Sequence, residues 1–298
     1  MKVDGVFAGG GVKAFSFIGA LRVMEEKGFA FDRVAGTSAG SIIAALVKAG
    51  YTSEDLHVLL DELDVESFKD ERISLLPFPI AKWIHLYFKF GLYRGDALEK
   101  WLKKALEKKG IRTFADLPPN SLKVVASDLT RGRMLVLPDD LMQYGVIPEK
   151  FSVARAVRMS CSIPFFFEPV KLYSRGSSRK PSYIVDGGIL SNFPIWLFRN
   201  GKLKMYRKPV IGFQLTPKIS ELPRNKMKNA IDMYRALFET MSNAHDLRYI
   251  DEEHAKNIVF IPVLDIKATD FELTEEQKKE LITLGRKETE EFLRDWSY

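Results

Sequence analysis

The chain has 298 residues, of which 46% are hydrophobic and 28% are charged, a composition typical of a globular protein with one large α/β domain or two small ones. Its single cysteine, Cys161, excludes an intramolecular disulfide and a cysteine-rich zinc site, and it fits a reducing compartment. No apolar run approaches the roughly 18–20 residues of a membrane-spanning helix, and the first residues carry Asp4 and several glycines. We therefore expect a strand and a loop at the start rather than a signal peptide, and a cytoplasmic protein.

Charge is distributed unevenly along the chain, whose formal net charge is +6. Residues 171–235 contain 14 lysines and arginines and three acidic residues, whereas residues 251–298 contain 13 acidic and seven basic residues. Two solvated faces of opposite charge, packed on each other, would explain this distribution. The alternative is attraction of the basic stretch to an anionic lipid surface. Nucleic acid is not expected as a partner, because no nucleic-acid-binding motif accompanies the charge.

Strand and helix patterns alternate through the first half of the chain. A short apolar strand, a glycine loop, a helix, the end of a second strand and a nearly all-apolar helix follow one another at residues 3–8, 9–11, 12–27, 34–35 and 39–49. Later strands are predicted in "SLKVVASDL", "MLVLPDD", "YIVDGGI", "PVIGFQLTP" and "NIVFIPV", and later helices at residues 53–63, 96–109, 153–160, 229–250 and 274–294. This order predicts a mostly parallel sheet covered on both faces, in one domain over residues 1–298.

The stretch "GTSAG" at residues 36–40 stands between the second strand and the apolar helix. On a sharp strand-to-helix turn the central Ser38 would be a nucleophile, and Gly36 and Gly40 would be needed because larger side chains would collide with the neighbouring strand and helix. The alternative is that Ser38 or Thr37 only caps the helix. A cap would not require glycine on both sides, so the pattern favours the nucleophile.

Three glycines, Gly9, Gly10 and Gly11, end the first strand and lead into a helix. Their amides could face an anion, either the phosphates of a dinucleotide or the oxyanion of a tetrahedral intermediate. A dinucleotide site needs an acidic residue at the end of the second strand, and Asp32 comes too early there. The pattern therefore favours an oxyanion hole, and Lys13 adds positive charge close to the loop unless it is only a solvated lysine.

The stretch "IVDGGILSNFP" places Asp186 at the end of an apolar strand, directly before Gly187 and Gly188. A carboxylate in this position would be exposed at the carboxyl edge of the sheet, which is also the edge that carries Ser38. Such a carboxylate becomes a general base when partial desolvation raises its pKa towards neutrality. The alternative is a plain Asp-Gly turn, in which the side chain only makes a local hydrogen bond.

Taken together, "GGGVKAF", "GTSAG" and "DGG", in this order, resemble the patatin-like phospholipase family. The softer stretches "GLYRGDALEKWL", "VVASDLTRGRMLVL" and "AVRMSCSIPFFFEPV" are similar to that family too, so that the resemblance spans about residues 1–215 and is loose over the extension at 216–298. The resemblance implies a three-layer α/β/α sandwich and hydrolysis of lipid acyl esters by a Ser-Asp dyad, with no histidine, metal or cofactor.

The family's site residues can be carried over position by position. The resemblance implies that Ser38 is the nucleophile and Asp186 its base, and that glycine-loop amides form the oxyanion hole, which are those of Gly10 and Gly11 with Gly9 or Val12. The glycine-rich box of the family ends in glycine after the basic residue, whereas this chain has Ala14 there. This departure bears on the oxyanion hole and leaves the dyad untouched.

A Ser-acid-His triad would need a histidine late in the chain, where His245 and His254 are the candidates. Both lie in a charged segment that is predicted to be helical, and no glycine-rich loop nearby would position either side chain at the site, so a surface position is favoured.

Residues 73–94 form an aromatic insert that is broken by prolines and carries interspersed basic residues. Such a segment could lie at a membrane surface or close the pocket as a buried cap. The function predicted is a lipid acyl hydrolase. A carboxylesterase for smaller soluble esters, a nucleotide-binding module using residues 9–11, and a non-catalytic scaffold with a degenerate site are the alternatives.

Overall fold

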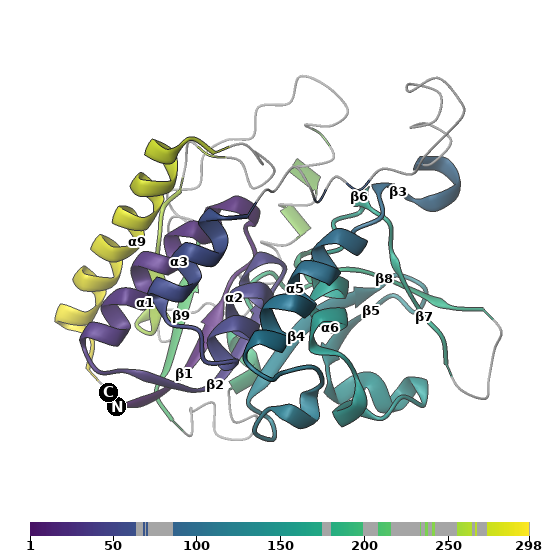
Figure 1. Ribbon diagram of the computed structural model, residues 1–298, viewed down its shortest axis with the longest axis horizontal. Helices are drawn as coiled ribbons and strands as arrows, with labels where there is room; N and C mark the ends of the chain where they lie inside the picture. The colour runs from purple at the N-terminus through teal and green to yellow at the C-terminus, as the bar shows by residue number, and fades with distance from the viewer. Residues whose placement is uncertain are drawn as a thin grey trace.

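The computed structural model describes residues 1–63, 68, 70, 86–174, 180–198, 208–215, 233, 236–237, 240–241, 255–263, 266 and 273–297 (Figure 1). Within these ranges one large sheet organises the chain. Its strand order is β10 (Ile258–Phe260), β9 (Val210–Gln214), β1 (Lys2–Phe7), β2 (Ala30–Thr37), β4 (Leu122–Asp128), β8 (Ser182–Asp186) and β7 (Val170–Leu172), and β5 (Arg133–Leu137) also pairs with β4. The first five strands are parallel and the others are antiparallel to their neighbours.

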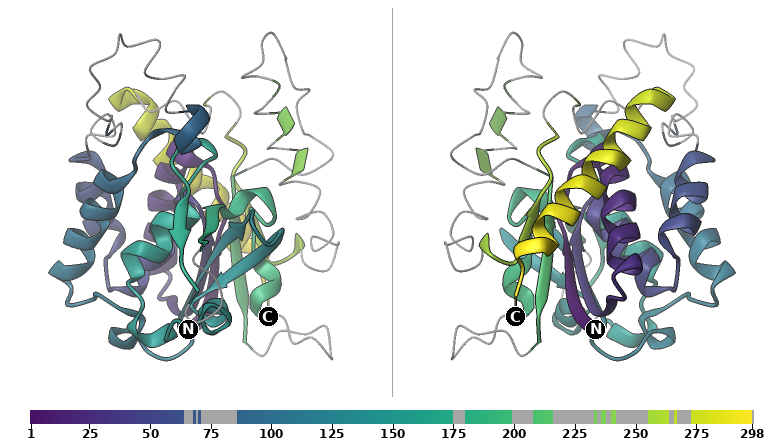
Figure 2. Two further views of the ribbon diagram at one scale, coloured as in Figure 1. Left: turned by 90° about the vertical axis from the view of Figure 1, so that its right-hand side faces the viewer. Right: turned by 90° about the vertical axis from the view of Figure 1, so that its left-hand side faces the viewer.

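Helices cover both faces of this sheet (Figure 2). One face carries α1 (Ser16–Glu26), α2 (Ala39–Lys48), α3 (Ser53–Asp61), α5 (Asp96–Lys108), α6 (Val153–Ser160) and α9 (Glu275–Asp295), and the other carries the short helix η7 (Ile195–Phe198). The remaining short helices are η1 (Gly11–Phe15), η3 (Phe114–Asp116), η4 (Asp139–Tyr144), η5 (Pro148–Lys150) and η6 (Gly187–Ile189), and β3 (Gly91–Tyr93) and β6 (Phe165–Phe167) form a second small sheet. The predicted fold class is confirmed.

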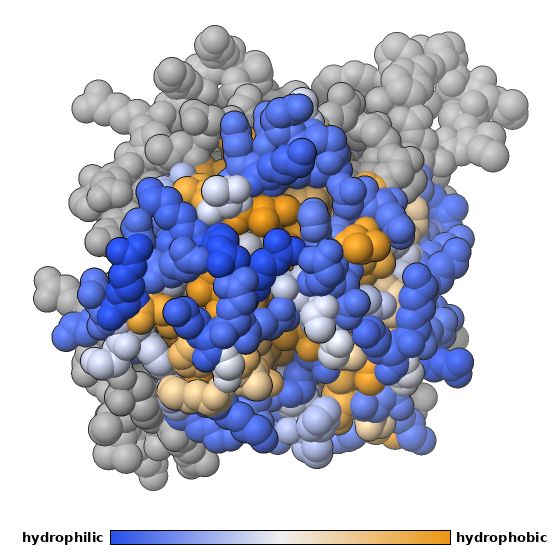
Figure 3. All heavy atoms as spheres, turned by 60° about the vertical axis from the view of Figure 1, so that its left-hand side comes forward, coloured by the Kyte–Doolittle hydropathy of each residue, from blue (hydrophilic) through white to orange (hydrophobic). Residues whose placement is uncertain are grey.

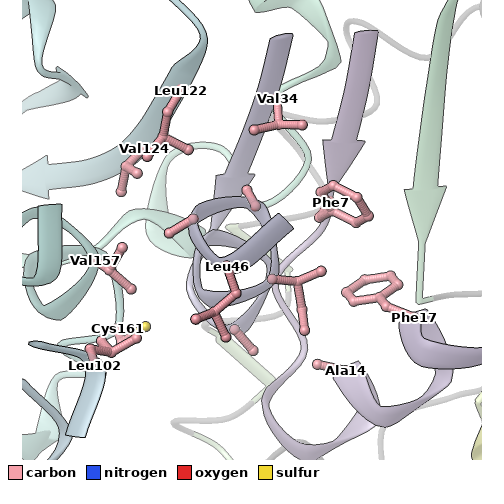
Figure 4. Close-up of a cluster of buried hydrophobic side chains, with 14 of the residues drawn as sticks. Phe7, Ala14, Phe17, Val34, Leu46, Leu102, Leu122, Val124, Val157 and Cys161 are labelled. Atoms are coloured by element: carbon pink, nitrogen blue, oxygen red, sulfur yellow. The ribbon is translucent and has the colours of Figure 1, made fainter. Parts of the chain in front are cut away.

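The main core lies between the sheet and the α1–α2–α6 layer. Side chains alternate across a strand, so Phe7 points into this layer while Val6 packs on the opposite face. Phe7 stacks on Phe213 of β9 with ring centroids 5.2 Å apart. In Figure 4, Leu46 of α2 lies between the aromatic side chains of β1 and α1 and the side chain of Val157. β1 is buried on both faces from Val3 to Phe7, so its apolar residues face both layers, and the buried Asp4 among them is bonded by Arg33.

Helix α9 packs directly against α1, although the two are far apart in the sequence. A Cβ atom at Gly285 would lie 1.8 Å from the carbonyl oxygen of Ser16, so the two backbones come closer than any larger residue allows. The helix begins with a capping box, in which the side chains of Thr274 and Gln277 each accept a hydrogen bond from the other residue's backbone amide. The predicted helix at 229–250 lies outside the described residues except for a few isolated positions.

Two predicted boundaries change in the structure. The helix expected over 12–27 is divided, because the tight turns of η1 precede α1 and carry the chain from the glycine loop into the core. The helix expected from Ser53 is capped by Thr52, which forms a capping box with Asp55. None of the described helices combines the length and the apolar character that crossing a membrane requires. Their outer face is mainly hydrophilic, with hydrophobic side chains visible in the furrows between helices (Figure 3).

Candidate active site

Ser38 occupies the sharp turn between β2 and α2. Its backbone has φ 51° and ψ −129°, an unfavourable conformation for a residue with a side chain. Gly40 permits this turn, because a Cβ atom there would lie 2.2 Å from the carbonyl oxygen of Phe7. The hydroxyl of Ser38 makes no capping hydrogen bond to α2, although the residue stands at the N-cap position. The geometry is therefore that of a strand-to-helix elbow and not that of a plain helix cap.

The sheet brings Asp186 to this elbow through an end-to-end meeting of two strands. β2 pairs with the first half of β4, up to Thr37 opposite Val125, and β8 pairs with the second half, starting with Asp186 opposite Ala126. Because β5 pairs with β4 along residues 124–128, β2 and β8 share the other edge of β4. The two strands run towards each other, so Ser38, which follows β2, meets the last residue of β8.

The two side chains are in direct contact. The hydroxyl of Ser38 donates to Oδ2 of Asp186 over 2.7 Å, and the amide of Gly188 donates to Oδ1 over 2.8 Å. Asp186 thus makes both the local Asp-Gly turn and the contact with Ser38, two roles that the sequence alone offers as alternatives. A Cβ atom at Gly187 would lie 2.2 Å from the carbonyl oxygen of Val125, so this position of the turn has room only for glycine.

Asp186 differs from the prediction in its burial and strand direction. The sequence predicts an exposed carboxylate at the carboxyl edge of parallel strands, but β8 is antiparallel and Asp186 is 1% exposed. Burial raises the pKa of this carboxyl to about 7, against the opposing effect of the hydrogen bonds from Ser38 and Gly188. The raised pKa agrees with the predicted direction.

Ser160 at the end of α6 is a neighbour of Ser38 that the sequence analysis does not single out. Its hydroxyl accepts the amide of Ser38 over 2.8 Å and donates to the carbonyl of Val125 over 2.5 Å. Ser41 donates to the carbonyl of Ser38 over 2.6 Å, so both backbone polar groups of Ser38 have partners. The only signal in the sequence is the run of small polar residues in "RMSCS", which also contains the buried Cys161.

The glycine loop lies beside the elbow. The amide of Gly9 donates to the carbonyl of Asn192 over 3.0 Å, and the side-chain amide of Asn192 donates back to the carbonyl of Gly9 over 3.2 Å. Among the described residues, the amides of Gly10, Gly11 and Val12 meet no acceptor. These three amides can donate hydrogen bonds to an anion. The amide of Gly9 already donates to Asn192, so Gly9 leaves the predicted set of donors.

Lys13 is not the solvated lysine of the alternative interpretation. Its ammonium group donates to the carbonyl of Val263, just after β10, over 2.9 Å. Ala14 is buried in the core behind the loop, where the sequence departs from the family pattern. The short helix η1 therefore contacts the segment after β10 through Lys13 and packs into the core through Ala14.

Several other predicted features lie away from this site or outside the described ranges. Asp32 stands in the first half of β2 and forms an ion pair with Lys208, whereas Ser38 follows the other end of that strand. No acidic group of β2 is therefore near the glycine loop in the way that a dinucleotide site requires. His245 and His254 lie outside the described residues, as do residues 73–85 of the aromatic insert.

A family model described as patatin-like phospholipase matches residues 5–199, which include the glycine loop, the elbow and the Asp-Gly-Gly turn. The chain belongs to the patatin-like phospholipase family. This places it among relatives described as lipid hydrolases.

Two curated relatives and one solved structure are similar to this chain. The protein YqhO of Bacillus subtilis (strain 168), described as uncharacterized, is 53% identical over 298 residues, the full length of both chains. The cUMP-AMP-activated phospholipase of Escherichia coli is 29% identical over 198 residues, which are 62% of this chain and 54% of that protein. The crystal structure of VipD from Legionella pneumophila has a TM-score of 0.57 at 17% identity and covers 99% of this chain and 67% of that one, a likeness of fold alone.

Proposed function

We propose that this member of the patatin-like phospholipase family is a lipid acyl hydrolase with Ser38 as nucleophile and Asp186 as general base. The observation that carries the proposal is the 2.7 Å hydrogen bond from the hydroxyl of a serine in a strained elbow to a buried carboxylate. A nucleophile hydrogen-bonded to its base is the arrangement that covalent catalysis requires.

The reaction has two steps. Ser38 Oγ bonds to the ester carbonyl carbon while its proton passes to Asp186, and the tetrahedral intermediate then breaks the ester C–O bond as the alcohol leaves with that proton. Water attacks the acyl-enzyme in the same way, giving its proton to Asp186 and releasing the fatty acid together with a regenerated Ser38. A base with a pKa of about 7 suits both proton transfers near neutral pH.

The oxyanion of both intermediates would be bound by the loop amides of Gly10, Gly11 and Val12. Their lack of acceptors among the described residues supports this assignment. A preorganised donor of this kind contributes about 3–4 kcal/mol to transition-state stabilisation. Donation by Asn192 to the carbonyl of Gly9 keeps the loop against the elbow.

The substrate class in the proposal is a phospholipid or lysophospholipid, because the chain belongs to this family and one relative is described as a phospholipase. A carboxylesterase acting on smaller acyl esters remains the second candidate, since the dyad chemistry is the same for both. The proposal includes a cytoplasmic protein in peripheral contact with membranes, without a cofactor or a nucleic-acid partner. It also treats residues 1–298 as one domain, which the close packing of α9 on α1 supports.

A fluorophosphonate probe and a panel of lipid esters test the proposal. Wild-type protein should be labelled and should hydrolyse at least one lipid, whereas Ser38→Ala should lose both properties. His245→Gln and His254→Gln are the matched controls and should retain most of the turnover. Loss of turnover in either histidine variant would contradict the dyad, and equal labelling of Ser38→Ala and wild type would overturn the proposal as a whole.

A further inference from the structure

We propose that an aromatic surface beside the site docks onto the surface of an anionic phospholipid bilayer. This surface, which we call the docking face, consists of five exposed hydrophobic side chains: Tyr87, Phe88, Phe90, Leu129 and Phe165. Tyr87 is 76% exposed and Phe88 is 67% exposed, which is unusual for aromatic side chains in a folded protein. The inference rests on the proposed function, because docking would bring that active site to its lipid substrate.

Contacts between the described residues connect the docking face into one surface. Tyr87 and Phe88 lie edge to face with ring centroids 5.0 Å apart, on the helical turn at 86–89. Phe90 contacts Tyr183 of β8 with centroids 5.6 Å apart, and the amide of Leu129 donates to the carbonyl of Tyr183 over 3.0 Å. Phe165 pairs with the residue after Phe90 in the small sheet of β3 and β6.

The docking face lies at the same end of the sheet as the elbow. β4 and β8 continue beyond the level of Ser38, and Tyr183 precedes Asp186 by three residues on β8. At 3.3 Å per residue, the strand places Tyr183 about 10 Å from Asp186. In Figure 1, β3 and β6 lie at the end of the molecule opposite to the two chain termini. A membrane bound there would therefore lie near the site and away from the termini.

Charge around the docking face selects an anionic partner. The described residues of the segments 86–94, 129–133, 165–174 and 180–183 contain one acidic residue, Glu168, and six basic ones, which are Lys89, Arg94, Arg131, Arg133, Lys171 and Lys180. Arg94 and Arg131 form ion pairs with Asp96 and Asp128, which flank these segments. Lys89, Lys171 and Lys180 are exposed. A basic side chain close to an anionic membrane contributes about 1 kcal/mol of attraction.

The combination of residue types favours a bilayer over a protein partner as the occupant. Tyrosine and phenylalanine at the depth of the headgroups bury their rings among acyl chains, while lysines reach the phosphates. Protein interfaces tend to be depleted in lysine, whereas membrane-surface segments are rich in it. The turn at 86–89 belongs to the aromatic insert at residues 73–94, for which the sequence leaves a membrane surface and a buried cap as alternatives.

Vesicle co-sedimentation with Ser38→Ala protein measures docking without hydrolysis. Binding to phosphatidylglycerol-containing vesicles should exceed binding to pure phosphatidylcholine vesicles by at least about tenfold and should decrease with salt. Adding Tyr87→Ser and Phe88→Ser should lower binding to the anionic vesicles by at least about tenfold. The matched control adds Val58→Ser and Met142→Ser, two exposed hydrophobic positions outside the docking face, and should bind as the parent does.

A charge-reversal pair completes the test. Lys89→Glu with Lys171→Glu should weaken binding to anionic vesicles, whereas Lys100→Glu with Lys103→Glu, which changes the net charge equally on α5, should have a smaller effect. Unchanged vesicle binding in the Tyr87→Ser, Phe88→Ser variant would overturn the inference. It would also be overturned if the parent binds no vesicles but self-associates with rising concentration, and if this variant abolishes the self-association.

Hydrolysis measurements separate this inference from the proposed function. In protein with an intact Ser38, the aromatic variant should lose at least about tenfold more activity on vesicle lipid than on a monomeric short-chain ester. Vesicle binding without any Ser38-dependent hydrolysis would support docking while removing the proposed function. If hydrolysis depends on Ser38 but the aromatic variant loses activity equally on vesicle lipid and on the short-chain ester, the proposed function stands and the docking inference fails.

Discussion

Two buried aspartates stand near opposite ends of the sheet, and they have different partners. Asp4 near the start of β1 is 0% exposed and is held by Arg33, whose Nε lies 3.1 Å and 3.0 Å from its two carboxylate oxygens. Asp186 at the end of β8 is 1% exposed, and its hydrogen-bond donors within the described ranges are both neutral, the hydroxyl of Ser38 and the amide of Gly188. Burial is equal, but only one carboxylate has a cation beside it.

This difference separates a structural carboxylate from one suited to chemistry. The Arg33 guanidinium lies against both carboxylate oxygens of Asp4, so this carboxylate has a partner of opposite charge. No cation in the described part of the chain pairs with Asp186, and burial raises the pKa of this carboxyl to about 7. A carboxyl that gains and loses a proton near neutral pH can act as a general base, whereas a firmly paired one cannot.

The largest expected effect is on turnover. Asp186→Asn removes the proposed proton acceptor, so we expect kcat for ester hydrolysis to fall by about 10³-fold or more. Asp4→Asn should leave kcat within about threefold and lower the free energy of unfolding by about 2 kcal/mol, because Arg33 loses its partner. Steady-state kinetics and urea unfolding of both variants measure these effects. A comparable loss of kcat in both would remove the distinction between the two aspartates.

The next effect is on stability as a function of pH. The folded-state pKa of Asp186 is raised to about 7 from the ordinary value of 3.8, so the folded protein binds this proton more tightly than the unfolded chain does. The stability that comes from the protonated form is complete below about pH 4 and is lost as the pH rises through about 7. The Asp186→Asn variant has no carboxyl group to titrate at this position, so its stability does not show this decrease with pH.

We therefore expect the Asp186→Asn variant to gain stability relative to wild type as the pH rises. The gain between about pH 4 and about pH 8 should be on the order of 2–4 kcal/mol, from about 1.4 kcal/mol per pH unit. Urea unfolding at several pH values measures it, with Asp4→Asn as the comparison that should lose stability. A stability difference between variant and wild type that does not change with pH would show that Asp186 does not titrate in this range.

The smallest effect concerns the support of the elbow. Ser160→Ala leaves the amide of Ser38 without its acceptor, so we expect a loss of about 1–2 kcal/mol in unfolding free energy and about a tenfold decrease in kcat. Ser53→Ala is the matched control, since Ser53 at the start of α3 is also buried but donates to the exposed Glu25 of α1. Its kcat should stay near that of wild type, and an unchanged kcat in Ser160→Ala would contradict the role of Ser160 in holding the elbow.

The sequence predicts the local parts of the site and fails where distant segments meet. The glycines around Ser38 and the turn after Asp186 follow from backbone geometry within a few residues, and the structure brings these two side chains together. The antiparallel direction of β8 and the burial of Asp186 depend on pairing with β4, which no local pattern encodes. Ser160 escapes notice for the same reason, because its partners are far from it in the chain.

By itself, the sequence determined which residues could do chemistry, because an elbow, a glycine loop and an Asp-Gly-Gly turn each require particular small residues at fixed spacing. It also determined the alternation of strands and helices that leads to a mostly parallel sheet. Only the tertiary structure decided that β2 and β8 meet end to end along β4, so that Ser38 lies within 2.7 Å of a carboxylate 1% exposed. The physical reason is that the pKa of a carboxyl depends on what surrounds it after folding, and those surroundings come from strands far apart in the chain.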